Sequence, residues 1–206
     1  MTTGAEPGNR SPAPTGLRAV QRFLNTNDRE GRHEKLASPD ALADWLVEQH
    51  YARRPPPVGP DDLTRTIAIR EGLREAAWLN NKGLPDPRRV EEFQRALAGF
   101  PVRLRTEGGR LTIRLASSDR EPDRALGEIL EAVLNSQANG TWPRLKACRR
   151  DVCRWVFYDR SRNNSGTWCA MSICGNREKA QRFRKTLRRR ASPFRSARER
   201  GKPEGT

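Results

Sequence analysis

Apolar residues recur at helical spacing through most of the first 140 positions. Spacings of three and four residues place the members of each group on one face of a helix. The groups are Leu17, Val20 and Leu24; Leu42, Trp45 and Leu46; Leu63, Ile67, Ala77 and Trp78; Val90, Phe93 and Leu97; and Leu126, Ile129, Leu130, Val133 and Leu134.

Capping residues mark the ends of these helices. Ser38, Asp61 or Asp62, and Asp86 stand where an N-cap oxygen is needed, and Pro39 and Pro87 suit a first turn. Glycine follows several of the patterns, as is typical of a helix C-terminus. We therefore expect five helices.

The period changes to two between residues 102 and 115. Val102, Leu104 and Thr106 alternate with arginines, a Gly108-Gly109 turn follows, and an alternating segment continues to Leu115. This pattern predicts one β-hairpin. Residues 17–143 are thus a mainly α, α+β domain, whereas the Gly/Pro-rich residues 1–16 are predicted to be a disordered arm.

Charge is concentrated at the C-terminal end of the sequence. The whole chain carries +15, but residues 147–206 hold 17 Lys/Arg against 5 Asp/Glu. Such a block attracts polyanions without implying sequence preference. A solvated, disordered tail over residues 191–206 is the alternative interpretation of part of this charge.

All four cysteines fall within residues 148–174. Cys148 and Cys153 form one C-x4-C pair and Cys169 and Cys174 a second, separated by fifteen residues. Two such pairs can surround one Zn²⁺ tetrahedrally, and four thiolates leave no position for a reactive water. We expect one structural zinc ion; the alternative is four unrelated thiols.

A zinc-finger module is expected over residues 144–190. A strand at 154–158, a turn at 162–166 and a returning strand at 167–169 would form a treble-clef-like arrangement with the two cysteine pairs. Nearby Arg149, Arg150, Arg154 and Arg177 would offset the negative charge of a zinc–thiolate centre.

A basic helix is predicted from Gly175 onward. Ala180, Phe183 and Leu187 recur at helical spacing and are expected to face the finger. The opposite face would then present the candidate phosphate contacts Arg182, Lys185 and Arg189. A merely solvated basic face is the alternative.

The second cysteine pair carries a specific signature. Cys174-Gly175-Asn176-Arg177, preceded by Trp168-Cys169 and followed by Lys179, closely resembles the CGNR zinc finger over residues 144–187. That finger usually follows an ABATE domain, which three segments of the chain resemble: Phe23-Leu24-Asn25-Thr26, Leu42 to Leu46, and Arg70 to Arg74.

The resemblance implies a stress-responsive bacterial transcription regulator whose finger binds DNA. Asn176 and Arg177 become candidate nucleic-acid contacts beside those already named. We expect a cytoplasmic, nucleoid-associated protein with duplex DNA as partner, no membrane and a homodimer as one arrangement. The alternative is an RNA- or ribosome-associated zinc protein, in which Trp155, Phe157, Tyr158 and Trp168 stack on bases.

Two arginines suggest a ligand site in the helical domain. Arg70 and Arg74 share a helix face with apolar residues, where a guanidinium needs an acidic partner or an anionic ligand. Asn25 and Thr26 are candidate neighbours in such a site. An internal salt bridge, or a stem that reaches the surface, is the alternative. No catalytic motif is present, so we expect no enzyme.

Overall fold

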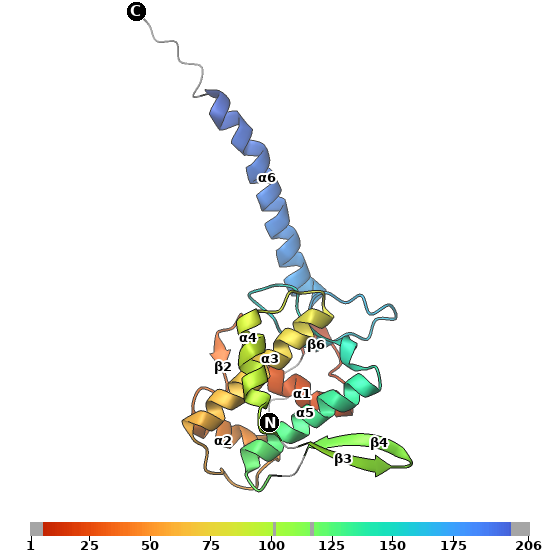
Figure 1. Ribbon diagram of the computed structural model, residues 1–206. Coiled ribbons are helices and arrows are strands. Elements are labelled where there is room, and N and C mark those ends of the chain that lie inside the picture. The colour runs from red at the N-terminus through yellow and green to blue at the C-terminus, as the bar shows by residue number, and fades with distance from the viewer. Residues whose placement is uncertain (1–5, 101, 116–117, 199–206) are drawn as a thin grey trace, which may run out of the picture.

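The computed structural model describes residues 6–100, 102–115 and 118–198, with a helical body and one long projecting helix (Figure 1). Its helices and strands are η1 (Pro7–Asn9), α1 (Thr15–Leu24), β1 (Asn27–Asp28), β2 (His33–Glu34), α2 (Pro39–Glu48), α3 (Pro60–Asn80), α4 (Pro87–Leu97), β3 (Val102–Glu107), β4 (Arg110–Leu115), α5 (Glu121–Ala138), η2 (Trp142–Arg144), β5 (Leu145–Ala147), β6 (Val156–Tyr158), η3 (Met171–Gly175) and α6 (Asn176–Arg198).

The mainly helical fold class is confirmed, and all three sheets are two-stranded antiparallel pairs in the described part of the chain. One core joins α1, α2, α3 and α5. Most of its members are residues that the helical periodicity placed on inner faces, and each large one contributes about 1.5–3 kcal/mol by leaving water. The predicted members include Leu17, Val20, Leu24, Leu42, Trp45, Leu46, Ala77, Leu126, Ile129 and Val133. The core also holds Phe23, Ile69 and Leu73, which the periodicity did not assign.

Helix starts follow the predicted capping chemistry with one correction. The Ser38 hydroxyl accepts a hydrogen bond from the Ala41 amide at 3.1 Å, and the Asp86 carboxylate caps α4. Helix α3 begins at Pro60, earlier than predicted, because Asp62 accepts from the Gly59 amide at 2.9 Å from its place inside the first turn. Asp62 therefore caps the helix from its third position, and Gly59 is the N-cap residue.

The predicted hairpin is present as β3 and β4. Val102 pairs with Leu115 and Glu107 with Arg110. Gly108 and Gly109 both have positive φ, 56° and 76°, which a tight hairpin turn of this twist requires. The hairpin lies at the edge of the helical body beside α5 (Figure 1).

The expectation of a disordered arm over residues 1–16 is wrong for residues 6–16, while residues 1–5 lie outside the described residues. The Arg10 guanidinium donates to the carbonyls of Cys169 at 2.6 Å and Trp168 at 2.9 Å, and it lies 4.5 Å from the Phe157 ring. Ala13 is completely buried. Trp155 also donates to Glu6 and Arg160 to the Pro12 carbonyl, and composition missed this order because it does not show such long-range contacts.

The zinc finger is not a separate packing unit. Leu145, Ala147, Val156 and Tyr158 from β5 and β6 belong to the same core as the helices. The Asn81 amide at the end of α3 donates to the carbonyls of Ala147 at 2.7 Å and of Thr167 in the finger at 2.8 Å. The boundary drawn between residues 143 and 144 therefore crosses a continuous interior.

Candidate metal centre and nucleic-acid interface

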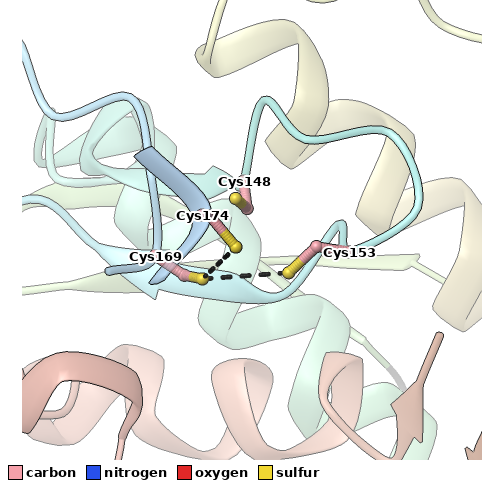
Figure 2. A group of neighbouring side chains, drawn as sticks. All are labelled: Cys148, Cys153, Cys169 and Cys174. Atoms are coloured by element: carbon pink, nitrogen blue, oxygen red, sulfur yellow. Dashed lines mark hydrogen bonds between the residues drawn. The ribbon is translucent and has the colours of Figure 1, made fainter. Parts of the chain in front are cut away.

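Three short structural elements bring the cysteines together. Cys148 directly follows β5, Cys153 lies in the loop between β5 and β6, and Cys174 lies in η3 immediately before α6. Figure 2 shows their side chains and that of Cys169 converging on one point. We call residues 148–153 the first knuckle. All four side chains are buried, with exposed fractions between 0% and 7%.

The spacing of the sulfurs fits a tetrahedral metal ion. Ligands held at a Zn–S distance of ~2.3 Å lie about 3.8 Å apart at the corners of a tetrahedron. The Sγ atoms of Cys153 and Cys169 are 3.8 Å apart, and those of Cys169 and Cys174 are 3.5 Å apart. All four ligand atoms lie within 4.8 Å of one another. The cysteines therefore form one structural zinc site.

Electrostatics also favours a cation at this point. Hydrogen bonds to Cys148 and Cys153, together with burial, raise the pKa of Cys169, and burial raises the pKa of Cys174. Four buried thiolates at this distance repel one another strongly, so they need a positive ion to stay ionised together. A zinc ion supplies that charge and fixes the three chain segments to one another.

The strand arrangement of the finger differs from the prediction. β6 pairs with β5, with Leu145 opposite Tyr158 and Ala147 opposite Val156, and the first knuckle is the connection between them. Residues 167–169 form no strand. A three-residue strand gives too short an alternation to be recognised, so the sequence assigned the wrong partner to β6.

A buried ion pair organises the loop that follows β6. Lys146 Nζ lies 2.8 Å from the Asp159 carboxylate and also donates to the carbonyls of Asn164 and Gly166. Burial would raise the pKa of Asp159, but hydrogen bonds from Lys146, Ser161 and Gly166 outweigh it and lower that pKa to about 2. The sequence alone suggested no role for this pair. The available signal was that Lys146 and Asp159 lie directly beside apolar strand residues in the chain.

The arginines beside the cysteines contact the helical domain. Arg149 donates to the carbonyls of Asn81 and Lys82 at the end of α3, at 2.8 and 3.1 Å. Arg154 lies 3.8 Å from the Trp78 ring and pairs with Glu75 and with Asp151. Arg149 in the first knuckle and Arg154 directly after it therefore attach this segment to α3.

Each residue of the Cys-Gly-Asn-Arg signature has a physical role. Cys174 is a metal ligand. A Cβ atom on Gly175 would lie 2.3 Å from the Met171 sulfur, so a larger residue there would displace the Met171 side chain. The Asn176 amide donates to the Ser172 carbonyl at 3.2 Å, and the Arg177 guanidinium bonds to Glu30. The predicted nucleic-acid contacts Asn176 and Arg177 thus have partners within the protein.

Helix α6 does not pack its apolar stripe on the finger, so that prediction is wrong. Phe183 is 65% exposed and Leu187 is 49% exposed. Arg182 and Lys185 face the first knuckle instead, where they line a cleft of about 500 Å³ with Arg149, Arg150, Asp151, Val152, Glu178 and Gln181. We call this the knuckle–α6 cleft. The side chain of Arg189 lies outside the described residues.

The expected tail over residues 191–206 is also corrected in part. The backbone of α6 continues to Arg198, and residues 199–206 lie outside the described residues. Arginine and alanine favour helix, and the first glycine after Gly175 is Gly201. The charge of this segment is therefore carried on a helix as far as residue 198.

Arg70 and Arg74 of α3 form internal salt bridges and hydrogen bonds, which was the alternative to a ligand site. Arg70 is 1% exposed and donates to both Glu34 carboxylate oxygens, at 2.6 and 2.7 Å, and to Glu71. Arg74, completely buried, donates to Glu71 at 3.2 Å and to the Arg154 carbonyl at 3.1 Å. Protein groups satisfy both guanidiniums.

The other two ligand candidates are engaged in the same way. The Asn25 amide donates to the Val156 carbonyl and accepts from the Val156 amide, both at 2.8 Å. The Thr26 hydroxyl donates to the Phe23 carbonyl at 2.8 Å and accepts from Arg70. These contacts connect α1 with β6 and α3, so Asn25 and Thr26 are engaged within the protein, whereas Arg70 lines a cleft of about 980 Å³.

No helix in the described part of the chain combines the length and apolar character needed to cross a bilayer.

The CGNR zinc finger family model matches residues 144–187. The ABATE family model, described as "Putative stress-induced transcription regulator", matches residues 17–146, more than half of the chain. A comparison with curated proteins finds no match. The chain therefore belongs to the ABATE family and carries a CGNR zinc finger at its C-terminal side.

Proposed function

We propose that this chain regulates transcription by binding duplex DNA through α6 and the first knuckle. The observation that carries the proposal is a basic helix that projects from the body with its base fixed at the zinc site (Figure 1). Every described side chain from Lys179 to Arg188 is exposed. The helix holds ten Lys/Arg and one acidic residue, Glu178.

The dimensions of α6 support a duplex as partner. At 1.5 Å per residue its 23 residues extend roughly 34 Å. A helix about 10–12 Å wide fits the DNA major groove, which is about 12 Å wide. Because Cys174 ties the helix base to the metal site, ordering on binding costs less than for a free basic tail. The proposal includes no catalytic activity.

Burial of the finger's aromatic residues argues against recognition of single-stranded RNA by stacking. Phe157 and Tyr158 are 1% and 6% exposed, and Trp155 and Trp168 pack against the cysteine cluster. A stacking platform needs exposed rings. Phe157 and Tyr158 are therefore not available for stacking on bases, which favours DNA over single-stranded RNA in this proposal.

The test compares partners directly. Zinc-loaded full-length protein is titrated by fluorescence anisotropy with a mixed-sequence 20-base-pair DNA duplex and with an RNA hairpin of equal charge, at several salt concentrations. We expect tighter binding to the duplex, with affinity falling steeply as salt rises. Light scattering of the complex reports whether one or two chains bind. Equal or stronger binding of the RNA would overturn the proposal.

A further inference from the structure

A carboxylate from the helical domain reaches across to the base of α6. Glu30 lies in the turn between β1 and β2, and one of its carboxylate oxygens accepts hydrogen bonds from both Arg150 and Arg177. Arg150 belongs to the first knuckle and Arg177 to the first turn of α6. The turn thus contacts both the first knuckle and the first turn of α6, where the helix leaves the body.

The position that Glu30 occupies has the chemistry of a phosphate site. Two guanidiniums that converge on one anionic oxygen form the arrangement that arginines use for phosphate as well as carboxylate. The site continues into the knuckle–α6 cleft, where Arg182 and Lys185 have no ion-pair partner among the described residues. The cleft therefore brings Arg150 together with Arg182 and Lys185 of α6, although Asp151 and Glu178 also line it.

The contact is accessible from solvent. The Glu30 side chain is 29% exposed and that of Arg177 is 54% exposed, so solvent and a ligand reach the ion pair. Arg150 is 20% exposed and has a second, more distant carboxylate in Glu178, at 3.9 Å. Ion pairs that solvent reaches are weaker than fully buried ones, so a multivalent anion can compete with them.

The other end of the same hairpin is firmly held. Glu34 in β2 makes the two-point contact with buried Arg70, and Asn27 in β1 donates to Glu34 at 2.9 Å. The turn that carries Glu30 is therefore supported by α3 whether or not Glu30 keeps its arginines. Loss of the Glu30 contact changes the charge at the base of α6 without removing the hairpin's anchor.

We infer that Glu30 occupies a phosphodiester site, and that a backbone phosphate of duplex DNA replaces it on Arg150 and Arg177 when the strand enters the knuckle–α6 cleft. The inference rests on the proposed function. Its consequence is that Glu30 lowers the affinity of the free protein for DNA, because each binding event must first release a carboxylate.

Glu30→Gln tests this inference in the zinc-loaded full chain. The variant keeps the side-chain shape but removes the charge, so we expect it to bind the 20-base-pair duplex about two- to tenfold more tightly than wild type. The plot of log affinity against log salt should steepen by up to about 1, because no carboxylate has to take up a cation on release. Zinc content and circular dichroism should be unchanged.

Glu48→Gln is the matched control. Glu48 is an exposed carboxylate in α2 that pairs with Lys35 at 2.5 Å, and its removal changes the net charge by the same amount. In an Arg150→Gln/Arg177→Gln background, adding Glu30→Gln should give no gain beyond that control.

The outcomes separate the two ideas. If wild type binds the duplex and Glu30→Gln gains no more than Glu48→Gln, the phosphate-site inference is overturned and the proposed function stands. If neither wild type nor Glu30→Gln binds the duplex at low salt, both are overturned. A gain seen with the RNA hairpin alone would contradict duplex DNA as the partner of this site. If Glu30→Gln binds the duplex and wild type does not, the inference is supported, because Glu30 alone then prevents binding.

Discussion

The Lys146–Asp159 pair shows how one residue contact controls a loop. Lys146 uses its ammonium on Asp159 and two loop carbonyls, while Asp159 also accepts from the amides of Ser161 and Gly166 at 3.0 and 2.6 Å. Both residues are almost fully buried. A buried pair is costly to break from one side, because the remaining charge has no water around it.

We expect Asp159→Asn to destabilise the protein by about 3–5 kcal/mol, the cost of leaving Lys146 buried without its counter-charge. Urea unfolding followed by circular dichroism measures this. Asp119→Asn, at an exposed position beyond the hairpin, is the control and should change stability by less than about 0.5 kcal/mol. A variant as stable as that control would mean that Lys146 finds another partner or reaches solvent.

At the scale of the element, the metal sets the rotation of α6 about its own axis. Cys174 must point at the zinc site, and this fixes which side of the helix faces the first knuckle. Burial of Phe183 and Leu187 would contribute about 1.5–3 kcal/mol each, whereas zinc binding in small fingers contributes roughly 10–16 kcal/mol. Zinc binding outweighs burial of the stripe, so Arg182 and Lys185 face the knuckle and the apolar side chains stay exposed.

If α6 reads the duplex, replacing Arg182, Lys185 and Arg189 together with alanine should weaken DNA binding at every sequence. Each lost phosphate contact should lower the slope of log affinity against log salt by about 0.9, so the total change should be about 2–3. Anisotropy titrations over a salt series measure both quantities.

Alanine substitution of Arg18, Arg22 and Arg53, three exposed arginines of the helical domain, removes the same charge elsewhere. A similar loss in this control variant would show that only net charge matters. Unchanged affinity and slope in the α6 variant would exclude this helix as the contact surface.

For the whole molecule, shared core residues and hydrogen bonds join the zinc finger to the helical domain. β5 and β6 contribute buried residues to the common core, Arg74 in α3 bonds to the Arg154 carbonyl, and Arg10 bonds to the Cys169 carbonyl. Loosening the metal site therefore disturbs contacts on α3 and on the N-terminal segment as well as within the finger.

Removal of zinc should consequently lower the melting temperature of the entire chain in a single transition. This differs from what two separate units, residues 17–143 and residues 144–190, would show. Circular dichroism and tryptophan fluorescence, recorded with and without a chelator, measure the transition, and Cys169→Ser should show no further response to chelator. Two well-separated transitions would contradict a shared core.

The sequence by itself determined the local and chemical features. Helical periodicity placed residues such as Val20 and Ile129 on inner faces, Ser38 marked a helix start, and the cysteine spacing with its signature identified the zinc site. Each of these depends on residues a few positions apart, or on a motif whose chemistry allows few arrangements. A short segment of chain therefore contains all that is needed to predict these features.

Only the tertiary structure decided which distant segments meet. It paired β6 with β5, ordered the N-terminal segment through Arg10, and satisfied Arg70 with Glu34 instead of a ligand. It also brought Glu30 to the base of α6, although the polar turn that carries it gives no local signal. The physical reason is that an arginine or glutamate specifies the charge of its partner but not its position, which depends on how the whole core packs.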